Sequence, residues 1–387
     1  MENFVLNNPT TVYFGKKTEE NVGKITASYS KNVLLHHYGV DILKMIGVYE
    51  TVIKSLNEAG VKFIELGGVK PNPRVSLIRE GIEICRKNKI DFILAIGGGS
   101  VIDSAKAIAF GVLYDGDVWD FFARKTRVEK TLPIGCVLTL PGTGSETSAS
   151  SVVTNDETGY KGSVDLDLIR PKFAIMDPQL TISLPAYQTS CGTFDAMSHV
   201  IERYFTDVTN VAVTDQQCES LMKAIIHIAP LQLIDPQNYD YRAEIMWASK
   251  LAHDGSLGVG RITDWTSHMV GHQISGTSDL THGASLAIVM PAWMKYIYKS
   301  HVDRFYKFAV NVWGVEPTIM NREQTAYEGI VRFESFLKRI GLPVRFTEAK
   351  LSASVIPEVI KWFKNGYRGR FHALTAEDIE KMLTLAI

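Results

Sequence analysis

The first half of the chain alternates short β-forming runs with runs of helical spacing, and this alternation restricts the possible folds more than any other feature. The predicted buried strands are Lys31–Leu35, Val61–Leu66, Asp91–Ile96, Leu132–Leu140 and Phe173–Met176. Between them lie predicted helices such as Asp41–Ala59 and Val75–Lys87. Strands that alternate with helices form parallel sheets covered on both faces, so the sequence predicts an α/β domain with a mostly parallel sheet.

The pattern changes after Asp177-Pro178, where long helical stretches follow with few strand signals. A chain of 387 residues is also longer than one typical hydrophobic core requires. We therefore predict two domains, an α/β domain over residues 1–182 and an all-α domain over residues 183–387, with the boundary near Ser183-Leu184-Pro185.

Charge and composition exclude several classes of partner. The formal net charge is −1, from 41 basic and 42 acidic residues, which provides no strong field for nucleic acid or an anionic membrane. The apolar run Phe92–Leu113 contains Asp103 and Lys106 and is not expected to span a membrane. The start of the chain lacks the basic and apolar regions of a secretory signal. Four widely spaced cysteines read as reduced thiols, so we expect a cytoplasmic protein.

A glycine-rich turn, Gly97-Gly98-Gly99-Ser100, separates a predicted strand from a predicted helix. Glycine lets a diphosphate approach the main chain, and the start of a helix supplies N–H donors and a positive dipole end. The spacing is not G-x-G-x-x-G, so the standard dinucleotide fingerprint does not apply. Phosphate binding and a simple tight turn both remain open for this motif.

A second glycine- and hydroxyl-rich segment, Thr139-Leu140-Pro141-Gly142-Thr143-Gly144-Ser145-Glu146, follows another apolar strand. It belongs at the same carboxyl edge of the sheet, where ligands of open α/β sheets bind. Two such loops suit a long ligand, of which a dinucleotide is the natural candidate. The alternative is a capped helix start. The expected cofactor-binding residues of the two segments are Gly97, Gly98, Gly99, Ser100, Asp103, Thr139, Leu140, Thr143 and Ser145.

An acid and several histidines recur at helical spacing in the second half. Asp195 and His199 are four residues apart, and so are His268 and His272; each pair shares a helix face. His282 follows at the start of a further predicted helix. One carboxylate with three imidazoles is a suitable ligand set for Fe²⁺ or Zn²⁺ with a position open for substrate. A lone histidine is more often structural, so the argument depends on the joint pattern.

An acid also follows the strand Lys31–Leu35, in the segment Gly39-Val40-Asp41. Asp41 and Gly39 are candidates to bind the adenosine ribose of a dinucleotide, where an acid accepts the hydroxyls and repels a 2′-phosphate. Asp41 is equally a candidate helix N-cap.

Together these motifs resemble the iron-containing (group III) alcohol dehydrogenase family, most closely its butanol dehydrogenase branch. The resemblance spans nearly the whole chain, from Phe14-Gly15-Lys16 onward. The motifs that carry it are Pro71-Asn72-Pro73, Gly97-Gly98-Gly99-Ser100 with Asp103 and Lys106, Thr143-Gly144-Ser145-Glu146, Asp195 to His199 with Glu202, and His268, His272 and His282-Gly283 ending at Pro291. Their order and spacing together are highly specific.

The resemblance implies a fold like that of dehydroquinate synthase, with a dinucleotide-binding α/β domain and an all-α metal-binding domain. It implies a metal held by Asp195, His199, His268 and His282, with His272 close by. It also implies that Gly98, Gly99 and Ser100 cradle a diphosphate. Thr139 and Thr143 would line the nicotinamide with Lys161 nearby, and Asn72 would contact the adenosine side.

The chain departs from the family in one loop. Many relatives carry three glycines and a serine after the position of Tyr38, where this chain has Gly39-Val40-Asp41-Ile42. The lost serine and the added acid favour NAD over NADP.

The function implied is a metal-dependent alcohol dehydrogenase or aldehyde reductase for short primary alcohols and aldehydes such as butanol and butanal. The metal acts as a Lewis acid on the substrate oxygen, and hydride passes to or from the nicotinamide. A cleft between the two domains is the expected place. His272 is the candidate proton relay, or alternatively a group that orients a ligand.

Three alternatives remain at this stage. A lyase resembling dehydroquinate synthase shares the fold, metal and NAD, but it needs a basic pocket, and only Arg203 and Arg261 lie near the metal motif. A metal-dependent hydrolase leaves the glycine-rich loops unexplained, and a non-enzymatic binding protein explains neither feature. As for assembly, Asn8–Phe14 reads as an edge strand able to pair across a homodimer.

Overall fold

The computed structural model describes residues 1–317, 321–367 and 369–387, which form two compact units. The α/β unit comprises Asn7–Leu184 and Pro236–Asp254, and the helical unit comprises Met1–Leu6, Pro185–Asp235 and Gly255–Ile387. A single cut at residue 182 would differ from this division in one main respect: helix α9 (Tyr239–His253) belongs to the α/β unit. Its buried Met246 is part of the α/β core. Helical spacing reveals that a helix is amphipathic but not which core covers it.

The α/β unit is built on a six-stranded sheet in which every neighbouring pair is parallel. Its order is β1-β8-β5-β4-β2-β3, with β1 at Thr11–Phe14, β2 at Asn32–His37, β3 at Lys62–Leu66, β4 at Phe92–Gly98, β5 at Ile134–Leu140 and β8 at Phe173–Met176. The predicted parallel sheet is confirmed.

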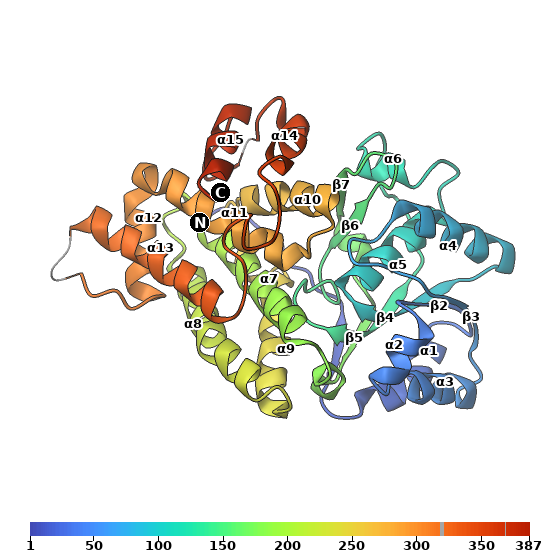
Figure 1. Cartoon of the computed structure of the whole chain (residues 1–387). Helices are drawn as coiled ribbons and strands as arrows, with labels where there is room; N and C mark the ends of the chain where they lie inside the picture. The colour runs from blue at the N-terminus through green and yellow to red at the C-terminus, as the bar shows by residue number, and fades with distance from the viewer. Residues whose placement is uncertain (318–320, 368) are drawn as a thin grey trace. The chain divides into compact units, whose positions relative to one another are not determined.

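Alternate strand residues point to two separate hydrophobic layers. In β4, Phe92 and Leu94 pack in one layer and Ile93 in the other. Helices α1 (Val22–Ala27), α2 (Val40–Met45) and α3 (Tyr49–Glu58) cover the first layer. Helices α4 (Val75–Asn88) and α5 (Gly99–Gly111) cover the second, so the sheet has helices on both faces (Figure 1).

Two local features differ from the sequence predictions. The single helix expected over Asp41–Ala59 is two helices, because Gly47 between α2 and α3 adopts a φ of 76°. Helical residues rarely adopt this left-handed conformation, and glycine adopts it without strain. An antiparallel hairpin of β6 (Ser150–Thr154) and β7 (Lys161–Asp165) was not predicted. Its strands are short and rich in serine and glycine, which gives a weak strand signal. The short helix α6 covers Trp119–Phe122.

The helical unit confirms the predicted all-α second half. It contains α7 (Ala186–Tyr204), α8 (Ala212–Ile234), α10 (Thr266–Ser278), α11 (His282–Ile297), α12 (Val302–Asn311), α13 (Arg322–Arg339), α14 (Val355–Ile360) and α15 (Ala376–Thr384). Helix α11 is almost wholly buried and contacts α7, α10, α13 and α15. It is therefore the centre of this unit, and its first residue is His282.

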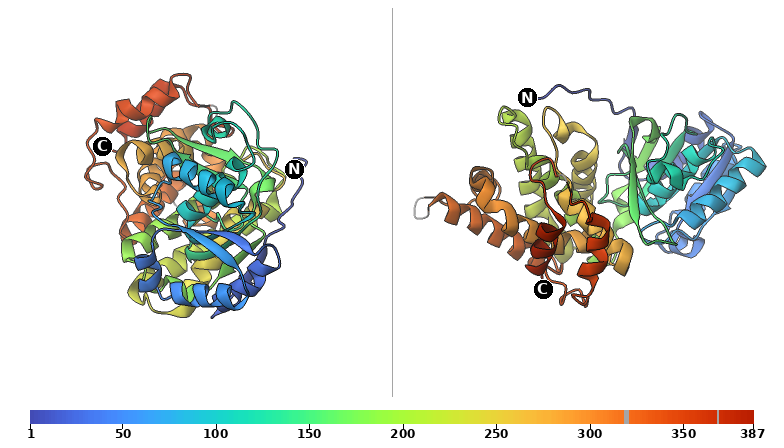
Figure 2. Two further views of the ribbon diagram at one scale, coloured as in Figure 1. Left: turned by 90° about the vertical axis from the view of Figure 1, so that its right-hand side faces the viewer. Right: turned by 90° about the horizontal axis from the view of Figure 1, so that it is seen from above.

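The first ten residues have no regular secondary structure and run as an extended trace (Figure 2). Within the parts of the chain that the structure describes, no helix has both the length and the apolarity to cross a membrane. All four cysteines are buried and free.

Candidate functional site

The glycine-rich segments lie at the carboxyl edge of the sheet. Strands β2, β4 and β5 are parallel neighbours, so their ends at His37, Gly98 and Leu140 lie along one edge. The direction of strand addition reverses between β2 and β4, because β3 lies beyond β2 whereas β5 and β8 lie beyond β4. Ligands of open α/β sheets bind outside this edge at such a switch point. The structure thus brings Gly39, Gly97–Ser100 and Thr139–Ser145 to the position expected for a dinucleotide.

The segments Gly97–Ser100 and Thr139–Ser145 touch each other where α5 begins. A Cβ atom at Gly99 would lie 2.3 Å from Oγ1 of Thr143, and one at Gly98 would lie 2.9 Å from Cβ of Leu140. The pairing of β4 with β5 also shifts register between Gly97 and Gly98. Only glycine permits this approach, and the N-cap of α5 makes no side-chain hydrogen bond to the amides at the start of the helix, a position that suits an anion.

Asp103 and Ser145 form a buried network behind the loops. The Asp103 carboxylate accepts from the Ser145 hydroxyl at 2.5 Å and from the backbone N–H of Val152 at 3.1 Å. The ammonium of Lys106 donates to the carbonyl oxygens of Ser145 and Ser150, each at 2.7 Å. Burial raises the pKa of Asp103 and lowers the pKa of Lys106 to about 8. These bonds hold the backbone of the Thr139–Glu146 segment in place. We therefore expect Asp103 to influence a cofactor indirectly, by positioning this backbone.

Asn72 and Lys161 form a hydrogen-bonded pair in the α/β unit. The Lys161 ammonium donates to Oδ1 of Asn72 at 2.8 Å, and the β6–β7 hairpin carries Lys161 to this position. Asn72 adopts a φ of 57°, which asparagine tolerates better than most residues. It is buried, and its Nδ2 has no hydrogen-bond partner among the described residues. A buried amide donor of this kind is available to a ligand.

Asp41 does not cap a helix. Gly39 is the N-cap of α2, and Asp41 is an exposed residue of the first turn. The capping interpretation is therefore wrong, although a carboxylate in the first turn still complements the helix dipole.

The predicted metal ligands converge in the helical unit. Asp195 and His199 lie on one face of α7, His268 lies on α10, and His282 is the first residue of α11. The Oδ1 atom of Asp195 lies 3.6 Å from Nε2 of His282, 3.9 Å from Nε2 of His268 and 4.0 Å from Nε2 of His199. One donor atom each from Asp195, His268 and His282 lies within 4.8 Å of the others, a group that does not include His199.

This donor set fits a divalent metal ion. Ligands at about 2.1 Å from a tetrahedral ion lie about 3.4 Å from one another, and the separations from Asp195 are close to this value. The donors are imidazole nitrogens and a carboxylate oxygen, which both Fe²⁺ and Zn²⁺ accept. Asp195, His199 and His268 are almost completely buried, so the site resembles a prepared ion pocket more than an exposed acidic patch.

Glu202 holds the second helix of the cluster in place. Its carboxylate accepts from the Trp265 N–H, the His268 N–H and the His268 ring Nδ1, each at 2.9 Å. With Nδ1 donating to Glu202, Nε2 of His268 is left as the metal-facing nitrogen. Glu202 follows His199 on α7 within the motif quoted above, but no local pattern indicates this role, because its partners lie more than sixty residues away.

The backbone beside the cluster is strained. Trp265, the N-cap of α10, has a φ of 106°, which is rare for a bulky residue. Its ring lies 5.1 Å from that of His268 and 6.0 Å from that of His199, measured between centroids. Such strain costs of order 1–3 kcal/mol and persists only where neighbours enforce it. The Glu202 bonds to Trp265 and His268 provide that enforcement.

His272 lies beside the cluster as the resemblance implies. It is buried, and its ring centroid is 4.9 Å from that of His282 and 6.2 Å from that of His268. The two arginines near the metal motif have structural partners. Arg203 donates to the carbonyl oxygen of His199 at 2.8 Å, and Arg261 donates to that of Arg203 and to the carboxylate of Asp215.

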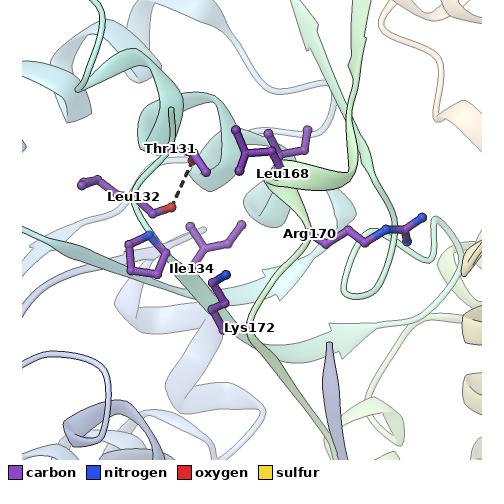
Figure 3. A pocket seen from close by; sticks show the side chains of 8 residues that line it. Thr131, Leu132, Ile134, Leu168, Arg170 and Lys172 are labelled. Carbon is purple, nitrogen blue, oxygen red and sulfur yellow. Dashed lines mark hydrogen bonds between the residues drawn. The ribbon is translucent and has the colours of Figure 1, made fainter. Parts of the chain in front are cut away.

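A surface hollow of about 280 Å³ lies at the opposite edge of the sheet, where β5 and β8 begin (Figure 3). Leu132, Ile134 and Lys172 line it, and the Arg170 side chain points away from it. The hollow contains none of the predicted site residues and is separate from the cofactor edge.

A parallel sheet with glycine-rich carboxyl ends, joined in one chain to a buried helical cluster of one carboxylate and three imidazoles, defines a metal-dependent oxidoreductase of the alcohol dehydrogenase class. Residues 9–178 match the model of the family described as iron-containing alcohol dehydrogenase, and residues 189–387 match that of the Fe-containing alcohol dehydrogenase family, C-terminal. The chain belongs to the iron-containing alcohol dehydrogenase family, and the predicted family is confirmed.

Similar proteins agree with this assignment over the full length. The probable NADH-dependent butanol dehydrogenase 1 of Bacillus subtilis (strain 168) is 40% identical over 100% of both chains. The crystal structure of NADH-dependent butanol dehydrogenase A from Thermotoga maritima is 37% identical, with a TM-score of 0.95 over 100% of this chain and 99% of that one. The NADPH-dependent aldehyde reductase YqhD of Escherichia coli (strain K12) is 33% identical over 93% of this chain and 92% of its own.

Proposed function

We propose that this protein reduces short-chain aldehydes, with butanal as the model substrate, and oxidises the corresponding primary alcohols with a nicotinamide dinucleotide and one divalent metal ion. The observation that carries the proposal is the convergence of three histidine Nε2 atoms on Oδ1 of Asp195. Similarity to proteins named as butanol dehydrogenases and an aldehyde reductase supports the substrate class.

Asp195, His199, His268 and His282 would hold the metal, which is Fe²⁺ or Zn²⁺. When bound, the ion supplies Lewis-acid polarisation of the substrate oxygen. Glu202 fixes the ring of His268 through its Nδ1 atom, and Asp195 brings a buried negative charge that a cation balances. His272, beside His282, would either pass a proton to the product oxygen or orient a water molecule.

The loops of the α/β unit would bind the dinucleotide. Gly97, Gly98, Gly99 and Ser100 would offer backbone N–H groups to the diphosphate. Thr139, Leu140, Thr143 and Ser145 would line the nicotinamide half. Asn72 would use its buried Nδ2 on the adenosine side, with Lys161 as its neighbour.

NAD is the proposed dinucleotide rather than NADP. Asp41 is exposed in the first turn of α2, at the carboxyl end of β2, where a carboxylate binds ribose hydroxyls and repels a 2′-phosphate. Gly39, two residues before Asp41, has no side chain that would hinder the approach of the ribose. The butanol dehydrogenases similar to this chain are named as NADH-dependent, although the Escherichia coli reductase is named as NADPH-dependent.

We further propose a cytoplasmic homodimer. Strand β1 is an edge strand paired only with β8 in the described sheet, and Tyr13 and Phe14 on it are partly exposed. An unpaired edge is a template for a second copy. Four free buried thiols fit a reducing compartment.

The test is loss of absorbance at the reduced-nicotinamide band. Metal-stripped protein is reloaded with Fe²⁺ or Zn²⁺ and given butanal with NADH or NADPH, beside His268→Ala and the exposed control His227→Ala. We expect metal-dependent consumption of NADH, faster than that of NADPH, lost in His268→Ala and kept in the control. Tight dinucleotide binding without consumption under any combination would overturn the dehydrogenase proposal in favour of a lyase.

A further inference from the structure

Helix α9 packs against the glycine-rich segment that follows β5, although more than a hundred residues separate them in the chain. The hydroxyl oxygen of Ser249 accepts from the backbone N–H of Gly142 at 2.7 Å. One turn later, Nδ1 of His253 donates to the carbonyl oxygen of Thr143 at 2.8 Å. Ser249 is fully buried. Two consecutive residues of the loop are thus bonded to two side chains on one face of α9.

Steric contact reinforces these bonds. Gly144 has a φ of 63°, and a Cβ atom there would lie 2.5 Å from Cβ of His253 and 3.2 Å from the carbonyl oxygen of Ser249. The loop therefore lies directly on the last turn of α9. Any side chain at Gly144 would push loop and helix apart.

The far end of the loop is tied to the same helix. Asn8 donates through Nδ2 to the carbonyl oxygen of Asp254, just after α9, at 3.0 Å, and to that of Thr147 at 3.4 Å. Arg170 donates to the same two carbonyl oxygens. In Figure 3 the Arg170 side chain extends away from Leu132, Ile134 and Lys172. The segment Gly142–Thr147 is held against α9 at both ends.

We propose that α9 clamps the segment Gly142–Thr147 by holding its backbone in one conformation, and that Ser249 and His253 are positioning residues for the dinucleotide. The inference rests on the proposed function, because Thr143 is expected to line the nicotinamide. The Gly142 N–H is fixed by Ser249 and the Thr143 carbonyl by His253, so the peptide groups before Gly142 and after Thr143 are both held in place. The cofactor therefore meets a loop that is already ordered, so less affinity is lost to ordering on binding.

The test uses the metal-loaded enzyme and an asparagine–glutamine pair at His253. Asparagine places an amide nitrogen at the position of Nδ1, whereas glutamine places it at the position of Nε2. We expect His253→Asn to bind NADH within about threefold of wild type, and His253→Gln and Ser249→Ala to bind about threefold to tenfold more weakly, the range for loss of one hydrogen bond. His227→Asn, an exposed histidine on α8, is the control.

Three readouts separate the possibilities: NADH affinity by fluorescence, the KM for NADH against kcat, and bound metal. A raised KM for NADH with kcat and metal content unchanged, rescued by asparagine, supports the clamp. Equal NADH affinity in His253→Asn and His253→Gln overturns it, as does a fall in kcat at unchanged affinity. Absence of NADH and NADPH binding in the wild-type holoenzyme would instead overturn the proposed function itself.

Discussion

The metal cluster and the dinucleotide loops each bury a glutamate, and they treat the two carboxylates differently. Glu202, beside the cluster, accepts three hydrogen bonds from Trp265 and His268. Glu146, at the end of the segment Thr139–Glu146, is equally buried, yet neither of its oxygens has a hydrogen-bond partner from another residue within the described parts of the chain. The first carboxyl group is held by its partners and in turn positions His268. The second is a buried carboxyl group that lacks such partners.

The two regions also offer different chemical groups for the proposed binding. The cluster presents side-chain nitrogen and oxygen atoms from three helices, whereas the loops present backbone N–H groups that remote side chains keep in place. A substitution at the cluster should therefore weaken metal binding and leave NADH affinity unchanged. A substitution behind the loops should weaken NADH binding and leave metal affinity unchanged. The predictions for Gly283, Glu202 and Asp41 test this separation, and the prediction for Glu146 tests the difference between the two buried glutamates.

The largest effect is expected from Gly283→Ala. A Cβ atom at Gly283 would lie 2.2 Å from the carbonyl oxygen of Cys191, so α11 must move away from α7 and carry His282 with it. Overpacking of this kind costs about 1–3 kcal/mol of stability. We expect about a hundredfold loss of aldehyde reduction and of metal affinity, the upper end of the range for residues that position a metal ligand, while NADH affinity stays within threefold.

Metal content by atomic absorption and NADH fluorescence measure the two effects. Gly258→Ala is the control, because a Cβ there would meet nothing closer than 3.8 Å. A Gly283→Ala protein that retains metal and activity would show that α7 and α11 can separate without displacing His282.

A smaller effect is expected from Glu202→Gln. In the wild type, both carboxylate oxygens of Glu202 accept hydrogen bonds from N–H groups. The glutamine amide keeps one acceptor oxygen, but its NH₂ group would face the backbone N–H of Trp265 or the ring N–H of His268, to which it cannot bond. Loss of such a partner typically weakens metal binding 10–100-fold. The dissociation constant of Zn²⁺, measured by competition with a chelator, should rise by that factor with little change in NADH affinity. An unchanged constant would mean that Glu202 shapes the Trp265 turn without orienting His268.

About a tenfold effect is expected from Asp41→Ser, which acts on the dinucleotide alone. Removing the exposed carboxylate abolishes repulsion of a 2′-phosphate, so the preference for NADH over NADPH should fall, and fall less at high salt because the repulsion is screened. The ratio of kcat/KM values at two ionic strengths measures this. Glu50→Gln, another exposed acid of the α/β unit, serves as the control. A ratio that does not move would place the ribose away from α2.

The sequence predicted the residues of the cluster better than it predicted the residues that support them. Asp195, His199 and His268 were identifiable as a group because an acid and several histidines recur at helical spacing on otherwise apolar faces. The glycine-rich turns were identifiable for a similar reason, since glycine and hydroxyl residues after a strand have a local meaning. The parallel sheet followed from the alternation of strands and helices.

The supports left no comparable signal. Ser249 and His253 are common residues on an ordinary amphipathic helix, and their partners Gly142 and Thr143 lie in another part of the chain. Helix α9 was assigned to the helical domain because nothing local shows which core covers Met246. The β6–β7 hairpin, which brings Lys161 to Asn72, has too few apolar residues for a strand prediction. Such contacts depend on tertiary packing, which local pattern does not encode.

The smallest measured change is expected for Glu146, as a shift of a few degrees in melting temperature. Burial raises the pKa of Glu146 from 4.5 to about 7, opposed by Lys106 and Lys250 and reinforced by Asp103. Between pH 4.5 and 7 the unfolded chain releases this proton while the folded chain keeps it, so Glu146 lowers stability as pH rises and reaches its full cost above pH 7. The cost is on the order of 3 kcal/mol.

Glu146→Gln cannot ionise, so its melting temperature relative to wild type should rise by a few degrees between pH 5 and pH 8. Thermal unfolding at four pH values, with Glu50→Gln as the control, measures this difference. Parallel curves would show that Lys106 or Lys250 satisfies the ionised carboxylate, and that the loops treat their buried glutamate in the same way as the metal cluster treats Glu202.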